Sequence, residues 1–146
     1  MHIQEKVSRE SQMPDEKILL VDDEDINLRL LTQWLIPLGY DIELASNGEE
    51  AVRKVRDSKP DLIILDIMMP VMDGYEACKI LKEDPKTKNI PIIMVTALHE
   101  RKSKLKGLSV SANDFLSKPI DQTELTIRVK NLLKIKAFDD FMLMKS

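Results

Sequence analysis

The sequence predicts an α/β protein with a doubly wound, five-stranded parallel sheet, and three observations lead to this prediction. From Lys17 onward, five short apolar segments alternate with five helical patterns. Strands separated by helices form right-handed βαβ units, which pack as a three-layer α/β/α sandwich. The runs 18–21 and 62–65 contain only apolar residues, as expected of central strands that are covered on both faces.

Each predicted element has a local signal. The strands are short runs rich in apolar and β-branched residues, at 18–21, 41–45, 62–65, 92–95 and, more weakly, 115–116. The helices show a 3.6-residue period or terminal capping residues, at 26–35 before Pro37, 48–56 behind Asn47, 75–82, about 100–108, and 121 onward. We expect a flexible lead-in over 1–15, the domain over 16–136, and a helical extension or linker over 137–146.

Two of these helices show an apolar stripe. In the first helix the stripe consists of Ile26, Leu30, Leu31, Trp34 and Leu35. In the last helix it continues past the expected end of the domain, through Leu125, Val129, Leu132, Ile135 and Phe138. We therefore expect an extended C-terminal helix that acts as a connector or a dimer seam. The alternative is a frayed end that packs on its own domain.

Composition excludes several classes of protein. The 22 Lys and Arg against 25 Asp and Glu give a net charge of −3, which does not favour a protein that coats nucleic acid. The single cysteine, Cys78, excludes an internal disulfide and is expected in the core. No apolar run approaches the roughly 18 residues of a membrane helix. We expect a cytoplasmic domain without a membrane or a direct nucleic-acid partner.

Polar residues follow four of the predicted strands at the point where each strand ends. Asp22 and Asp23 follow the first strand, Asp66 the third, Thr96 the fourth and Lys118 the fifth. The carboxyl ends of parallel strands meet at one edge of the sheet, so these side chains should cluster there. Acids at 22–25 alone would also suit a helix start, but that explanation does not account for the other strand ends.

The chemistry of this cluster favours a divalent cation and a phosphoryl group. Crowded carboxylates repel one another unless a cation joins them, and an all-oxygen set favours Mg²⁺. An ammonium group and a hydroxyl beside such an ion suit the oxygens of a transferring phosphoryl group. No Ser-His or Cys-His pairing is evident, so a carboxylate is the expected acceptor.

Four motifs together resemble the receiver domain of two-component response regulators. They are Val21-Asp22-Asp23, Leu65-Asp66-Ile67-Met68-Met69-Pro70-Val71-Met72-Asp73-Gly74, Val95-Thr96-Ala97 and Lys118-Pro119. The resemblance extends from about Lys17 to Lys136, about four-fifths of the chain. It implies the flavodoxin-like sandwich with strand order 2-1-3-4-5.

The resemblance also implies the ligands of the site. Asp66 would accept a phosphoryl group from a phosphohistidine on a sensor histidine kinase or a phosphotransfer protein. Mg²⁺ would be bound by Asp23, by Asp66 and by the backbone carbonyl of Met68, with Asp22 acting through a water.

Other residues would form a switch, again by resemblance. Lys118 and Thr96 would each contact a phosphoryl oxygen, and Phe115 would be the aromatic residue that rotates inward with Thr96. The Lys118–Pro119 peptide bond would be cis. Phosphorylation would then alter a surface formed by the fourth helix, the fifth strand and the fifth helix. Residues 99–136, which cover it, hold nine Lys or Arg against four Asp or Glu.

Several functions follow as expectations. The output would be a downstream domain or protein, or a homodimer through that same surface. We expect self-phosphorylation and self-dephosphorylation but no turnover of an external metabolite. One alternative is a pseudo-receiver that binds partners without phosphorylation. Another is an aspartate-based Mg²⁺ phosphohydrolase, which would need a second acid where this chain has Met68.

Overall fold

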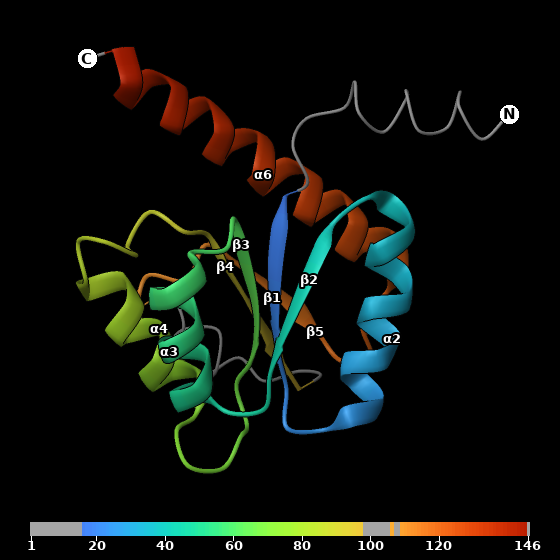
Figure 1. Cartoon of the computed structure of the whole chain (residues 1–146). Coiled ribbons are helices and arrows are strands. Elements are labelled where there is room, and N and C mark those ends of the chain that lie inside the picture. Colours follow the sequence, from blue (N-terminus) through green and yellow to red (C-terminus); the bar gives the residue numbers. More distant parts are fainter. Residues whose placement is uncertain (1–15, 98–105, 107–108, 146) are drawn as a thin grey trace, which may run out of the picture.

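The computed structural model describes residues 16–97, 106 and 109–145, and it confirms the predicted sheet. Five parallel strands are arranged in the order β2-β1-β3-β4-β5 (Figure 1). The strands are β1 (Lys17–Val21), β2 (Asp41–Ala45), β3 (Leu62–Asp66), β4 (Ile92–Thr96) and β5 (Asp114–Ser117). Every residue of β3 and β4 is buried, as two central strands require.

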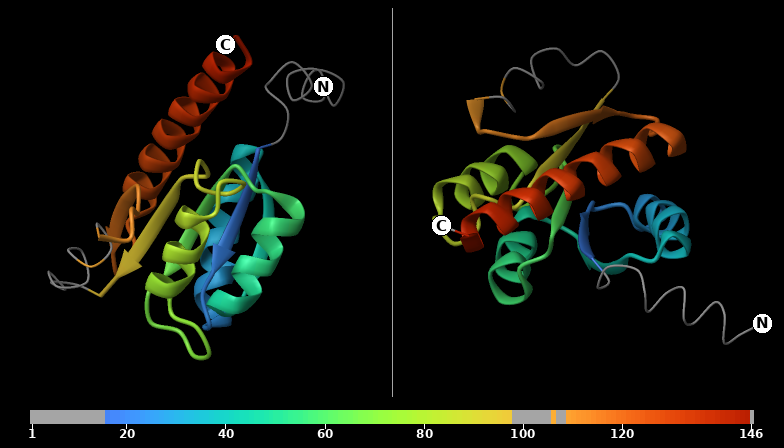
Figure 2. Two further views of the ribbon diagram at one scale, coloured as in Figure 1. Left: turned by 90° about the vertical axis from the view of Figure 1, so that its left-hand side faces the viewer. Right: turned by 90° about the horizontal axis from the view of Figure 1, so that it is seen from above.

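Helices cover both faces of the sheet, which gives the predicted three layers (Figure 2). They are α2 (Asp25–Leu35), the 3₁₀ turn η1 (Ile36–Leu38), α3 (Gly48–Ser58), α4 (Gly74–Glu83) and α6 (Gln122–Lys145). Alternate residues of each strand point to opposite faces. Leu19 and Val21 therefore join the core under α3 and α4, whereas Ile18 and Leu20 join the core under α2 and α6. Most of the helix predicted at about 100–108 lies outside the described residues.

The helix starts follow local capping chemistry. The side chain of Asn47 accepts a hydrogen bond of 2.8 Å from the backbone N–H of Glu50, as predicted for the start of α3. Asp73 accepts one of 2.9 Å from Glu76 at the start of α4. Each bond satisfies a backbone donor that has no partner within the helix. The second cap also determines where the loop that follows β3 ends.

The apolar stripe predicted for α2 was partly wrong. Leu28, Leu31 and Leu35 are buried against the sheet, whereas Ile26 is 72% exposed and Leu30 is 43% exposed. Helical residues advance by about 100° each, so positions 26 and 30 lie about half a turn around the helix from Leu28. Trp34 packs at the edge of the core, and Cys78 is buried in α4 as expected.

The extended C-terminal helix is confirmed, since α6 continues without a break to Lys145. Its first half buries Leu125, Val129 and Leu133 against the sheet. Its second half passes the amino ends of the strands and projects beyond them (Figures 1 and 2). There the Lys136 ammonium lies 3.8 Å from the carboxylate of Asp61, which directly precedes β3. Within the described part of the chain, no helix is long and apolar enough to cross a membrane.

Candidate functional site

Three carboxylates gather where β1 and β3 end. Asp22, Asp23 and Asp66 each place one carboxylate oxygen within 4.8 Å of the others. Asp22 and Asp66 are buried, while Asp23 is exposed. β1 and β3 are hydrogen-bonded neighbours whose register pairs Val21 with Leu65, so the following residues necessarily emerge side by side. An oxygen-only group of this kind suits a hard divalent cation such as Mg²⁺.

Lys118 supplies a positive charge to the same point. Its ammonium nitrogen lies 3.2 Å from the carboxylate of Asp66 and 4.0 Å from that of Asp22. The Lys118 backbone N–H donates a 2.8 Å hydrogen bond to the carbonyl of Thr96, which ties the end of β5 to the end of β4. The Lys118–Pro119 peptide bond is cis, as expected. Four strands thus deliver their terminal side chains to one edge.

Crowding and burial alter the acidity of this group. Burial, followed by the nearby charge of Asp22, raises the pKa of Asp66 to about 6, although Lys118 acts in the opposite direction. Burial lowers the pKa of Lys118, but the carboxylates of Asp66 and Asp22 outweigh this and leave that pKa raised. An extra cation at the cluster would therefore favour the charged, nucleophilic form of Asp66.

Thr96 has an unsatisfied hydroxyl at this edge. The residue is 1% exposed, and its Oγ1 has no hydrogen-bond partner among the residues that the structure describes. A buried hydroxyl without a partner costs free energy. The arrangement therefore suits an incoming acceptor such as a phosphoryl oxygen.

The loop between β3 and α4 packs closely against the backbone at the end of β3. The Gly74 N–H donates a 2.9 Å hydrogen bond to the carbonyl of Ile67. A Cβ atom at Gly74 would collide with the carbonyl oxygen of Asp66 and approach the Cα of Ile67 to 2.9 Å. Only glycine therefore fits here. The close contact of Gly74 with the backbone of Asp66 and Ile67 places the start of α4 against the end of β3. The same loop holds Val71 at a φ of 71°, which is strained for a β-branched residue.

Sequence reasoning missed two residues that shape the site. One is Gly74 as a contact residue. The other is Asn27, whose side-chain amide donates a 3.0 Å hydrogen bond to the carboxylate of Asp22. Asn27 and the Glu24 N–H, at 2.9 Å, together orient Asp22. The available signal was a polar residue in the first turn of α2, five positions after Asp22.

A small cavity of about 160 Å³ adjoins the cluster. It is lined by Asp22, Asn27, Leu30, Leu31, Lys118, Pro119 and Ile120. The exposure of Leu30 thus has a structural context, because this side chain forms part of an apolar rim beside the carboxylates. A partner that reaches the site would meet this rim.

Phe115 and Met68 complete the predicted set of site residues. Phe115 is half-buried and packs against the core beneath α3 and α4. The side chain of Met68 is 76% exposed, directly after the strand that ends in Asp66. The metal contact of the Met68 carbonyl and the rotation of Phe115 stay predictions.

Comparison with known proteins identifies the family. Residues 18–130 match the family described as the response regulator receiver domain. The chain belongs to this family. Receiver domains of response regulators are signalling modules, and the acidic cluster of this one fits their phosphorylation site.

The curated relatives that match this chain are longer proteins. It is 43% identical over 124 residues to the response regulator PleD of Caulobacter vibrioides, covering 85% of this chain and 27% of that protein. It is 44% identical over 120 residues to the alkaline phosphatase synthesis transcriptional regulatory protein PhoP of Bacillus subtilis, covering 82% and 49%. The chain thus spans half or less of the length of these relatives.

A solved structure shows the same fold. The receiver domain of the sensor histidine kinase PA1611 from Pseudomonas aeruginosa matches with a TM-score of 0.77 and 30% identity, over 83% of this chain and 99% of that one. Its structure contains a magnesium ion coordinated in the active-site cleft.

Proposed function

We propose that Asp66 is the phosphoacceptor of this receiver domain and that a phosphohistidine on a partner protein is the donor. The observation that supports this most directly is the 3.2 Å contact between Lys118 and Asp66 inside a cluster of three carboxylates. Three carboxylates crowded at the ends of two strands repel one another unless a cation or another ligand joins them, and this supports a binding site rather than a purely structural cluster.

The proposed reaction is a phosphoryl transfer. A carboxylate oxygen of Asp66 forms a bond to phosphorus while the bond between phosphorus and the imidazole nitrogen of the donor breaks. Lys118 offsets charge on one phosphoryl oxygen, and the unpartnered hydroxyl of Thr96 donates to another. Hydrolysis by water later returns Asp66 to its carboxylate form. No external metabolite is turned over.

Mg²⁺ fits this set of donors. Asp23, Asp66 and the carbonyl of Met68 would hold it, with Asp22 acting through a water. When bound, the ion offsets the repulsion among the carboxylates and the charge of the phosphoryl oxygens. The magnesium ion in the cleft of the PA1611 receiver supports this choice.

The proposed partners follow from the reaction. A sensor histidine kinase or a phosphotransfer protein would supply the phosphoryl group. The output would be a downstream domain or protein that responds when Thr96 and Phe115 move, or a homodimer formed by the helix predicted at about 100–108, β5 and α6. We also propose a cytoplasmic location, which the family resemblance and the single cysteine support.

The test is the intact mass of the protein after incubation with acetyl phosphate. We expect a gain of one phosphoryl group with Mg²⁺ and none with a chelator. The Asp66→Asn variant should gain nothing, whereas a matched Asp57→Asn variant on the exposed face of α3 should behave as wild type.

Three outcomes would overturn the proposal. No gain in the wild type would make the chain a pseudo-receiver, and a gain that survives in Asp66→Asn would mean that another residue is the acceptor. Release of phosphate from an unrelated monoester by the wild type would instead identify a phosphohydrolase.

A further inference from the structure

The side of α6 that faces the domain changes from apolar to charged along the helix. Leu125, Val129 and Leu133 are buried against the sheet. Lys136 and Asp140 continue the same side, since both lie within about 40° of Val129 around the helix. Charged residues therefore occupy the positions at which further apolar side chains would extend the core.

Lys136 connects this side of the helix to the domain. Its ammonium donates a 2.6 Å hydrogen bond to the carboxylate of Asp140 and lies 3.8 Å from that of Asp61, which directly precedes β3. The Lys136 side chain is only 17% exposed, which is unusual for a lysine. Most lysines keep the ammonium in water, whereas this one is within ion-pair distance of carboxylates on two separate segments.

Asp61 is a fixed partner for this lysine. One of its carboxylate oxygens accepts a 2.8 Å hydrogen bond from the backbone N–H of Lys17. The Asp61 N–H in turn donates a 2.8 Å hydrogen bond to the carbonyl of Lys17. These two bonds join the starts of β1 and β3, and Lys136 contacts the other carboxylate oxygen. Asp61 therefore cannot follow Lys136 if the helix moves.

A second acid at this edge of the sheet increases the need for a cation. Glu16 directly precedes β1, and its carbonyl accepts a 2.9 Å hydrogen bond from the N–H of Asp41 at the start of β2. Burial, followed by the charge of Asp61, raises the pKa of Glu16, whereas Lys136 acts in the opposite direction. The two acids thus repel each other, and Lys136 offsets that repulsion.

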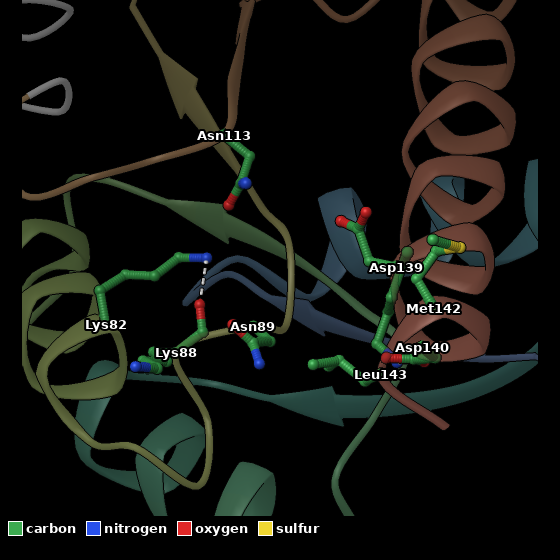
Figure 3. Close-up of a pocket in the computed structure, with 9 residues that line it drawn as sticks. Lys82, Lys88, Asn89, Asn113, Asp139, Asp140, Met142 and Leu143 are labelled. Carbon is green, nitrogen blue, oxygen red and sulfur yellow. Dashed lines mark hydrogen bonds and ion pairs between the residues drawn. The ribbon is translucent and has the colours of Figure 1, made fainter. Parts of the chain in front are cut away.

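Past Lys136 a groove of about 680 Å³ lies between α6 and the segment 82–89 (Figure 3). The groove is lined on the helix by Lys136, Asp139, Asp140, Met142 and Leu143, and across from it by Lys82, Lys88 and Asn89. Farther along, Met144 is 87% exposed. Lys136 therefore lies where the close packing of α6 on the sheet gives way to this groove.

We propose that Lys136 is an electrostatic anchor that fixes the direction in which the projecting half of α6 leaves the domain. Its partners are Asp61 on the domain and Asp140 on the helix itself. Loss of the Lys136 charge releases the projecting half, while the buried apolar residues of α6 keep the first half on the sheet.

The helix converts a small change at the anchor into a larger movement at its end. A tilt of about 30° at Lys136 would move residue 144 by about 6 Å, because about 12 Å of helix lies between them. The anchor thus determines where the exposed end of α6 is presented to a partner. It lies at the amino edge of the sheet, so its behaviour does not depend on whether Asp66 accepts a phosphoryl group.

The test is a distance measurement between two spin labels in the full 146-residue chain. One label is attached at Met144→Cys and the other at Asp57→Cys on the exposed face of α3. Cys78 is buried, and burial raises its pKa to about 11, so the native thiol should not react with the label. We expect a narrow distance distribution, which Lys136→Met should shift or widen by about 6 Å.

Three further variants isolate the charge. Lys134→Met makes the same chemical change at an exposed position of α6 and should leave the distribution unchanged. Lys136→Arg keeps the charge and should keep the distribution narrow. Asp61→Asn retains an oxygen for the Lys17 N–H but loses the charge, so it should act as Lys136→Met does. Circular dichroism should show the same helix content throughout.

Salt gives an independent readout, because it screens charges. At 1 M salt the Debye length falls to about 3 Å, so the wild-type distribution should widen toward that of Lys136→Met, and the variant itself should not respond. An unchanged distribution in Lys136→Met, or equal widening in Lys134→Met, would overturn the proposal. So would a loss of helix content in Lys136→Met, which would make the lysine a support of the helix rather than of its direction.

Discussion

Asp66 holds a charge that the unphosphorylated protein accommodates poorly. Its side chain is 5% exposed and lies beside Asp22 and Asp23. Burial accordingly raises its pKa from the ordinary 3.8 to about 6. The unfolded chain has no such environment. Ionisation of this one residue should therefore oppose folding at neutral pH.

We expect a pH dependence of stability that Asp66→Asn removes. Between about pH 4 and pH 6 the native state binds the proton that the unfolded state has released, so the free energy of unfolding falls as pH rises. Above pH 6 the loss levels off at about 3 kcal/mol. Asp66→Asn should thus be more stable than wild type at pH 8, by up to about this amount, and closer to it at pH 4.

Urea unfolding in a chelating buffer measures this difference. Asp57→Asn, at an exposed position on α3, is the control and should follow the wild-type profile. Parallel profiles for wild type and Asp66→Asn would show that Asp66 titrates normally.

Two buried threonines offer a matched comparison at the same scale. Thr96 and Thr87 are each 1% exposed, but the Thr87 hydroxyl donates a 2.7 Å hydrogen bond to the carbonyl of Leu81 while the Thr96 hydroxyl has no partner in the described structure. We expect Thr96→Val to stabilise the unphosphorylated domain by about 1 kcal/mol and Thr87→Val to destabilise it by a similar amount. Urea unfolding of both variants checks this, and equal losses would mean that the Thr96 hydroxyl is satisfied in solution.

At the scale of elements, the contact between α4 and β3 depends on one glycine. A methyl group at Gly74 would enter the space of the Asp66 carbonyl and the Ile67 backbone. We expect Gly74→Ala to destabilise the fold by about 1–3 kcal/mol. It should also slow phosphorylation by acetyl phosphate. The backbone that must move to admit the methyl group is that of Ile67 and of Asp66, the proposed acceptor.

Gly39→Ala separates this steric effect from a backbone effect. Gly39 has a φ of 96° and nothing near its missing Cβ. An alanine there should cost about 1 kcal/mol through strain alone and leave the rate of phosphorylation unchanged. If the two variants changed phosphorylation equally, close packing at Gly74 would not be what positions the site.

The strand bounds were easier to predict from the sequence than the buried side of a helix. The β-rich runs predicted the strands to within a residue or two, since a buried parallel strand allows little besides apolar side chains. The stripe of α2 was harder, because Ile26 and Leu30 are apolar yet point away from the sheet. Leu30 instead lines the cavity next to Asp22, a placement that depends on how the segment at 118–120 folds back.

At the scale of the whole molecule, a bound cation should link the site to global stability. A ligand that binds only the native state stabilises it by RT ln(1 + [L]/Kd). We expect Mg²⁺ at 100 times its Kd to raise the free energy of unfolding by about 2.7 kcal/mol. Removal by a chelator should reverse this increase fully.

The increase in the free energy of unfolding with Mg²⁺ should vanish in Asp23→Asn, which loses a carboxylate of the cluster. It should persist in Asp25→Asn, whose side chain is exposed and lies outside the cluster. Urea unfolding with and without Mg²⁺ measures both. A gain of equal size in the two variants would locate the cation elsewhere.

The sequence by itself determined the fold class, the strand order through resemblance, and the residues that meet at the carboxyl edge. It could do so because alternation of strands and helices leaves few topologies, and because parallel strands bring their ends to one edge whatever packs around them. Only the tertiary structure decided how Asn27 orients Asp22 and why Gly74 cannot carry a side chain. Both contacts depend on the three-dimensional path of the loop between a strand and the helix that follows it, and the residue pattern alone does not specify that path.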